Sequence, residues 1–329
     1  MKEAMFYDLV SQSCHACPEP RALRSGGGKP LTRRLAALAV AAALMTGTAV
    51  PAFADVYDIR KGSITIVANG DGTAKVTQNE TVNDKDDDVK VTGSNEVTGN
   101  TVDIINNTDN DLKVTLSDVT ITDPKGDAAP VSVSGTGNTA IELDGSNTLN
   151  SGSGHAGLEH NKTDTSGELT IQDNDKNGSL KAAGGQYGAG IGGAGAANDA
   201  QVKITGGKIT ATGGEYGAGI GGGFKGSGDV TISGGEIHAN GGNYGAGIGG
   251  GDYSSGKVTI SGGEINATGG YLGAGIGGGE KGSGDVTITG GEITSATGGK
   301  YGAGIGGGQE GRGDVTIEGN TEVNAAGGT

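Results

Sequence analysis

Short runs of alternating apolar and polar residues recur along the second half of the chain. In one of them, Val230 and Ile232 flank Thr231, and the same arrangement returns at Val258, Val286 and Val315. Alternation with a period of two is typical of strands that bury one face. The pattern therefore predicts short strands whose Val and Ile side chains point inward.

A repeat of 28 or 29 residues links these strands. The string GAGIGG occurs five times, with its isoleucine at Ile191, Ile220, Ile248, Ile276 and Ile305. Each unit reads as three short segments, for example VTI (230–232), EIHA (236–239) and YGAGI (244–248), separated by glycine-rich corners. A single coil cannot bury its own apolar face, so coils must stack, at a strand spacing of about 4.8 Å. Because parallel crossovers are nearly always right-handed, we predict an all-β, right-handed parallel β-helix (solenoid) with about 28 residues per coil.

The chain before the regular repeats has a similar texture. Residues 55–150 hold short alternating segments such as SITIVA (63–68) and LKVTLSDVTIT (112–122), bounded by Gly, Asn or Asp. We interpret 55–150 as irregular coils, with a separate β domain as the alternative, and 151–329 as the regular glycine-rich repeats. Since the sequence stops where another YGAGI segment would begin, we expect the array to be truncated at its C-terminus.

The segment 1–54 has the pattern of a leader with a signal peptide. A double arginine precedes the apolar run 35–50, and Ala52 and Ala54 fit an A-x-A cleavage site. The run is short for a membrane span of about 20 residues. We therefore expect a secreted or extracellular protein with no integral membrane span in its mature chain. Attachment to the cell wall through a segment beyond residue 329 is one form of this expectation.

The charge of the chain restricts its partners. Removing the 6 basic and 3 acidic residues of the leader from the totals of 23 and 38 leaves 17 and 35, a net charge of −18. Nucleic acid is excluded, because phosphates require basic surfaces. Gly217, Gly219 and Gly222 match the GxGxxG nucleotide fingerprint, but the motif opens no helix and recurs in every unit. We therefore expect no nucleotide.

One column of the stacked repeat is rich in aromatic residues. It consists of Tyr187, Tyr216, Tyr244, Leu272 and Tyr301. Exposed rings can stack on sugar rings, which makes the four tyrosines candidates for carbohydrate binding. Leu272 keeps the bulk of the column but lacks a ring face, which favours the alternative of an apolar ladder packed at a corner.

Two groups of oxygen-rich residues are candidate calcium ligands, and calcium is the one cofactor that the sequence suggests. Asp173, Asp175 and Asn177 match the first half of a calcium loop, although Gly184 stands where a bidentate glutamate is needed, so a polar turn is the alternative.

Glu236, Glu264, Glu292 and Glu322 should stack in a second group, with no basic residue among them. Like charges at this spacing repel. They must therefore be solvated or share a cation.

Several motifs resemble those of glycine-rich β-helical surface proteins of Gram-positive gut bacteria, of the type that contains a carbohydrate-binding domain. They are AGLEH (156–160), GELTI (167–171), the run GSLKAAGG (178–185) and the GAGIGG blocks. The resemblance implies a secreted or cell-surface location and contact with a polysaccharide or another host or bacterial glycan. It assigns no binding residue.

Three functions remain open. A secreted or cell-surface, non-catalytic, glycan-binding module is the leading hypothesis, and a structural or adhesive stalk with a binding domain beyond residue 329 is the alternative. A polysaccharide lyase or hydrolase is the third. Arg60 and Arg312 are the only arginines after the leader, and the acidic residues repeat in columns instead of converging. We therefore expect no enzyme.

Overall fold

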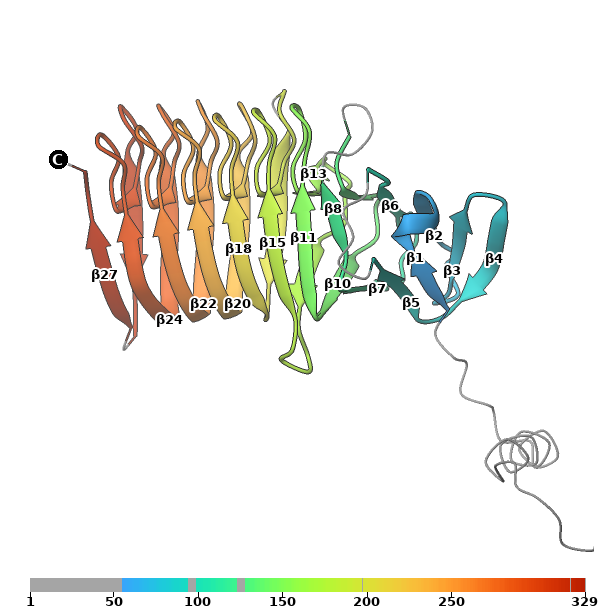
Figure 1. Cartoon of the computed structure of the whole chain (residues 1–329). Coiled ribbons are helices and arrows are strands. Elements are labelled where there is room, and N and C mark those ends of the chain that lie inside the picture. Colours follow the sequence, from blue (N-terminus) through green and yellow to red (C-terminus); the bar gives the residue numbers. More distant parts are fainter. Residues whose placement is uncertain (1–54, 94–98, 123–127, 197, 320, 329) are drawn as a thin grey trace, which may run out of the picture. The chain divides into compact units, whose positions relative to one another are not determined.

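A computed structural model describes residues 55–93, 99–122, 128–196, 198–319 and 321–328 of the chain. The predicted leader and signal peptide lie outside these residues. The described residues belong to one compact unit, a parallel β-solenoid of about eight turns with roughly 29 residues per turn (Figure 1). They contain no α-helix. The prediction of a parallel β-helix is confirmed.

The first side of each coil contributes one strand to a 16-stranded sheet. Neighbouring strands on this side pair in parallel from β1 to β26. They are β1 (Val56–Asp58), β5 (Val89–Thr92), β7 (Leu112–Ser117), β10 (Thr139–Asp144), β14 (Leu169–Gln172), β17 (Asp199–Ile204), β20 (Gly228–Asn240), β22 (Gly256–Thr268), β24 (Gly284–Thr297) and β26 (Gly313–Ile317).

The second side belongs to the same sheet, because β20, β22 and β24 run through both sides. The glycine corner expected between VTI and EIHA is therefore a bend inside one long strand, where the register shifts at Ser233. The other strands of this side are β8 (Thr120–Thr122), β11 (Ser146–Asn150), β15 (Ser179–Ala183), β18 (Lys208–Thr212) and β27 (Glu322–Ala326).

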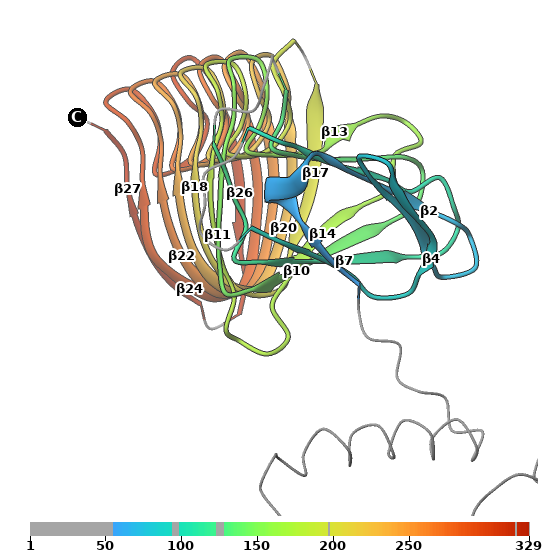
Figure 2. The same ribbon diagram turned by 45° about the vertical axis from the view of Figure 1, so that its right-hand side comes forward.

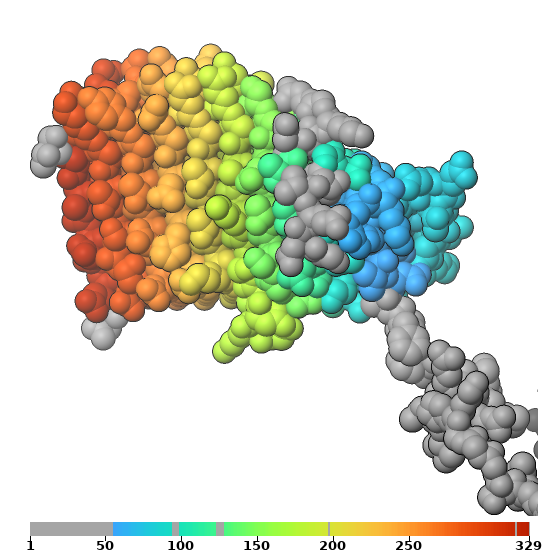
Figure 3. Space-filling view, in the orientation of Figure 1, coloured from blue at the N-terminus to red at the C-terminus, as the bar shows by residue number. Residues whose placement is uncertain are grey.

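The third side forms an 11-stranded sheet that contains the five GAGIGG isoleucines in register. Its parallel strands are β2 (Ile64–Ala68), β6 (Val102–Ile105), β9 (Val131–Ser134), β12 (Leu158–Glu159), β16 (Ile191–Gly192), β19 (Ile220–Gly221), β21 (Ile248–Gly249), β23 (Ile276–Gly277) and β25 (Ile305–Gly306). Figure 3 shows the coils as successive colour bands.

An antiparallel hairpin extends the 11-stranded sheet beyond β2, at the N-terminal end of the solenoid. β3 (Ala74–Gln78) pairs with β2, and β4 (Thr81–Asp86) pairs with β3 (Figure 1). A short 3-10 helix, η1 (Ile59–Lys61), precedes β2. Exposed sheet edges invite pairing with other chains. The hairpin therefore protects β2, and the strands between residues 56 and 150 join the same two sheets as the regular repeats.

The core is a set of apolar columns. Val230 and Ile232 are fully buried while Thr231 between them is half-buried, as the alternation predicts. Each of these residues pairs with its own type one coil later. Stacking of identical side chains fills the narrow interior without a second layer.

Glycine at the third-side corner answers a steric requirement. Gly221 has a φ of +131°, and an added Cβ would lie 2.0 Å from the carbonyl oxygen of Gly249 in the next coil. A side chain would therefore both strain the backbone and collide with the neighbouring coil. This is a structural role for the glycines of the GAGIGG string.

Candidate functional site

Three of the four candidate tyrosines form a ladder of stacked rings. The ring centroids of Tyr187 and Tyr216 are 5.3 Å apart at an interplanar angle of 9°, and those of Tyr216 and Tyr244 are 5.0 Å apart at 12°. Phe224 tilts against the rings of Tyr187 and Tyr216, at 5.7 and 5.5 Å. Both faces of the Tyr216 ring are therefore covered, so a sugar cannot stack on them.

Tyr301, the fourth candidate, stands apart from this ladder because Leu272 separates it from Tyr244 in the column. It meets Tyr271 edge-on at 5.4 Å, and the Lys300 ammonium lies 5.0 Å from its ring centroid. The exposed ring of Tyr301 therefore packs against Tyr271 and Lys300.

Tyr187 begins the ladder, and this makes it different from the other rings. Since Leu158 pairs with Ile191, the residue of the preceding coil that corresponds to Tyr187 is Gly154. A glycine at this place leaves a hollow of about 450 Å³, lined by Tyr187, Phe224 and polar residues. Tyr187, which is 37% exposed, therefore lines this hollow with no stacked ring before it in the column.

The polar wall of this hollow is built around Glu159, which is 8% exposed. Its carboxylate lies 2.7 Å from His155 Nδ1 and accepts hydrogen bonds from the Ala156 backbone N–H at 3.2 Å and from Asn161 Nδ2 at 2.8 Å. Asn161 Oδ1 accepts the backbone N–H of Ala194 at 2.8 Å. The hydrogen bonds fix the carboxylate before any ligand arrives. We call the space between this wall and the two aromatic rings the Tyr187 hollow.

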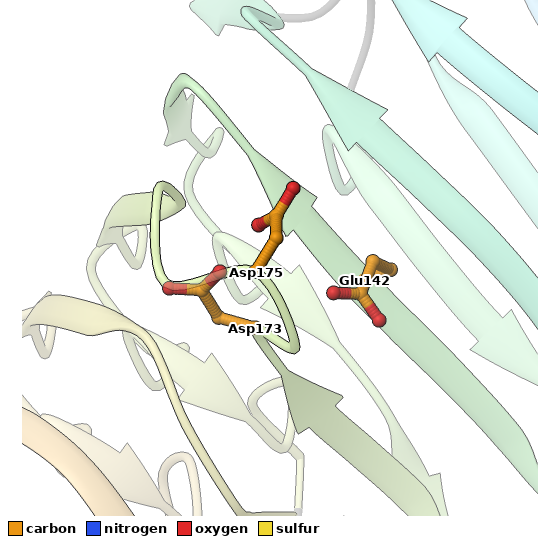
Figure 4. A group of neighbouring side chains, drawn as sticks. All are labelled: Glu142, Asp173 and Asp175. Carbon is orange, nitrogen blue, oxygen red and sulfur yellow. The ribbon is translucent and has the colours of Figure 1, made fainter.

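The predicted calcium loop gains a third carboxylate in the structure. Glu142, on β10, lies with Asp173 and Asp175 of the turn after β14, and their oxygens are within 4.8 Å of one another (Figure 4). Asp173 accepts the backbone N–H groups of Asn177 and Gly178, as a polar turn requires. Burial raises the pKa of Asp173. Carboxylate oxygens are ligands that calcium prefers, and calcium binding here stays a prediction.

The glutamate column is present, with one correction. Glu236, Glu264, Glu292 and Glu322 pair in register from coil to coil. No basic residue lies among the four glutamates, as expected, but Glu236 is not left to solvent or a shared cation, because Lys208 precedes it in the same column, with its Nζ 2.7 Å from Glu236 Oε1.

This contact changes the chemistry of one end of the column. Lys208, and after it His238 at 3.1 Å, lower the pKa of Glu236. Glu264 and Glu292 are exposed to solvent.

A comparison with protein-family models agrees with this geometry. A model described as a beta helix repeat matches residues 202–224, 230–252, 258–280 and 286–309, one coil each. The chain is a β-helical repeat protein. Comparisons with curated proteins and with solved structures found no match. Within the described part of this β-helical repeat protein, no helix has the length and apolar character needed to cross a bilayer.

One feature of the sequence of this β-helical repeat protein coincides with the Tyr187 hollow, namely the AGLEH segment, but the sequence alone did not indicate that it lines a site. Leu158 and Glu159 align with Ile191 and Gly192, so AGLEH (156–160) stands where the next coil has AGIGG (189–193). The nearby His160 is buried, with its ring nitrogens 3.1 Å from the Val133 carbonyl and 2.9 Å from the Gly167 carbonyl. A departure from the repeat, and not the repeat itself, marks the candidate site.

Proposed function

We propose that this β-helical repeat protein is an exported, non-catalytic module that binds glycans outside the cell. The observation that carries the proposal is the Tyr187 hollow, where an aromatic ring borders open space beside a fixed carboxylate. Apolar and aromatic walls with a few placed polar groups are typical of small-ligand sites.

The chemistry of the hollow suits a sugar ring. The C–H groups of a pyranose carry slight positive charge and pack well against the negative face of an aromatic ring such as Tyr187. A carboxylate offers about four acceptor positions, of which three at Glu159 are used by His155, Ala156 and Asn161. The remaining position is available to a sugar hydroxyl.

The same hollow supports binding without hydrolysis. Glycosidases use a pair of carboxyl groups on the two sides of the scissile bond. Among the described residues that line the hollow, Glu159 is the only acidic one, and its carboxylate is held by His155. An acid and a nucleophile are therefore not both supplied.

A structural or adhesive stalk is the second candidate. It is favoured by the unbroken columns of identical core residues, which give a stiff rod through repetition alone. A stalk needs no ligand of its own, which separates it from a glycan-binding module in an experiment.

Glycan-array screening of the full chain, followed by calorimetry on the hits, tests the proposal. Tyr187→Leu is the informative variant, because Leu272 already occupies this column and shows that the coil tolerates leucine. We expect Tyr187→Leu and Glu159→Gln to lose binding, whereas the matched control Tyr301→Leu keeps it.

Other outcomes would count against the proposal. If no host or bacterial polysaccharide binds, the stalk is favoured. Release of reducing ends or of unsaturated sugars would show an enzyme.

A further inference from the structure

A second hollow, of about 630 Å³, lies across the beginnings of β17, β20, β22, β24 and β26. It shares β13 (Asn161–Lys162) with the Tyr187 hollow, and β13 pairs antiparallel with β17 (Figure 2). Asn161 lines the Tyr187 hollow and Lys162 lines the second one. Because it crosses successive coils, we call it the axial groove.

The floor of the axial groove is bare backbone. It follows the register column Gly228, Gly256, Gly284 and Gly313. An added Cβ at Gly256 would lie 2.1 Å from the carbonyl oxygen of Gly277, so this position faces the interior. At these four coils no side chain rises from the floor between the two lips, and at β17 the same column holds the buried Ala200.

The two lips are alike at the three central coils, where Ser227, Ser255 and Ser283 stand opposite Asp229, Lys257 and Asp285. At the two end coils the serine lip carries Asp199 and Arg312 instead, and Asp314 ends the charged lip. Successive coils are about 4.8 Å apart, which is close to the length of one pyranose unit. A polymer of sugars lying parallel to the solenoid axis would thus meet one set of lip side chains per unit, with a hydroxyl opposite a charged group at each of the three central coils.

The floor cannot accept a peptide strand. Addition of a strand requires free N–H and C=O groups at a sheet edge, but here these groups are used between coils. The backbone N–H of Gly256 donates to Ser283 O at 2.9 Å, and that of Gly284 donates to Arg312 O at 2.8 Å. Recognition in the groove must come from side chains.

The charges of the lips favour an uncharged ligand. Lys162 Nζ lies 3.2 Å and Lys257 Nζ 4.0 Å from the same Asp229 oxygen, so opposite charges meet within the groove. Asp199, Asp285 and Asp314 would repel a polyanion, and Lys162, Lys257 and Arg312 would repel a polycation. An ammonium has three donors and a carboxylate has several acceptor positions, and a hydroxyl, which both donates and accepts, can use either.

We propose that the axial groove binds a linear, uncharged glycan parallel to the solenoid axis, with successive sugars on successive coils. The inference rests on the proposed function for the class of ligand, but it concerns a different surface. The two sites can therefore fail independently.

Calorimetry with the full chain and neutral oligosaccharides of two to six sugars, from the cellulose, mannan and xylan series, tests the proposal. Affinity should rise with length to about five sugars, because five coils line the groove. The double variant Lys257→Gln/Asp285→Asn should weaken hexasaccharide binding about tenfold. Lys208→Gln/Glu236→Gln, which removes the same two charges outside the groove, should change nothing.

The other results have distinct meanings. If the hexasaccharide binds no better than the disaccharide, or if Tyr187→Leu alone removes all binding, the groove proposal is overturned while the proposed function stands. Tighter binding of polygalacturonate than of any neutral hexasaccharide overturns the assignment of an uncharged ligand. If no glycan binds the chain at all, both proposals fall.

Discussion

Asp252 lies one coil before Glu280 at the same place in the repeat, close enough for the two carboxylates to interact electrostatically. Asp252 is 2% exposed, and its Oδ1 has no hydrogen-bond partner among the described residues. Burial, followed by the negative charge of Glu280, raises the pKa of Asp252 to about 6. The charged form of this side chain is therefore unfavourable in the folded solenoid.

The stability of the solenoid should consequently depend on pH through Asp252. A folded-state pKa above the unfolded value favours the protonated, folded form, so this contribution is complete below about pH 4 and is lost as the pH rises through about 6. Asp252→Asn should remove this dependence and stabilise the chain at pH 7 by up to about 3 kcal/mol.

Urea unfolding of both proteins between about pH 4 and 7.5 measures the difference. Asp285→Asn, at an exposed aspartate, is the control and should leave the pH dependence intact. Parallel curves for the wild type and Asp252→Asn would contradict the prediction.

The tyrosine ladder should contribute to stability unevenly. Tyr216→Ala removes a ring that is stacked on both faces and touched by Phe224. Each aromatic pair is worth about 0.5–1.5 kcal/mol beyond its buried area, so we expect a loss of about 2–4 kcal/mol in the free energy of unfolding. Tyr301→Ala, at a ring that is 49% exposed, should cost about 1 kcal/mol. Equal losses would show that stacking contributes little.

The core columns lead to a similar comparison. Ile248 is fully buried between Ile220 and Ile276, and Ile248→Ala should cost about 2–5 kcal/mol by leaving a cavity. Thr259, half-buried on the outer face of β22, should cost under about 1 kcal/mol when changed to alanine. Thermal unfolding followed by circular dichroism compares the two, and a similar shift for both would mean that the column is not the main source of stability.

The coil could be predicted from the sequence because the spacing of apolar residues is the same in every repeat unit. Every unit places an apolar residue at the same offset, so the column from Ile191 to Ile305 follows from counting. The register does not depend on the details of any one loop. Fold class and core were therefore accessible without coordinates.

The candidate sites could not be predicted from the spacing of the repeat. The Tyr187 hollow depends on a side chain that is missing at Gly154, in a coil whose register the irregular sequence conceals. Glu142 joins Asp173 only because β10 pairs with β14. Lys208 becomes the partner of Glu236 because β18 pairs with β20, which brings a lysine into register with the first glutamate of the column. In each case the site arises where neighbouring coils differ.

Calcium binding by Glu142, Asp173 and Asp175 remains to be tested. A bound cation would relieve the repulsion among the three carboxylates and stabilise the folded chain by mass action. We therefore expect calcium to raise the melting temperature beyond a sodium control of matched ionic strength, and Glu142→Gln to abolish the rise. Glu264→Gln is the matched control. Loss of the rise in that variant would place the cation on the glutamate column, and no rise in the wild type would leave only a polar turn.

The corner glycines allow backbone strain to be separated from contact between coils. Gly221 and Gly306 have nearly the same φ, +131° and +130°. An added Cβ at Gly221 would lie 2.0 Å from the Gly249 carbonyl oxygen, whereas at Gly306 the nearest atom is the Gly313 Cα at 3.3 Å.

Alanine at either position suffers the strain of a positive φ, which costs about 1–3 kcal/mol, but only Gly221→Ala also forces two coils apart. We expect Gly306→Ala to remain folded with this loss. Gly221→Ala should lose more than about 4 kcal/mol, or fail to give a β-rich circular dichroism spectrum at all. Urea unfolding of the two variants measures both effects. An equal loss in the two would mean that backbone conformation alone, and not the close approach of the coils, requires glycine at these corners.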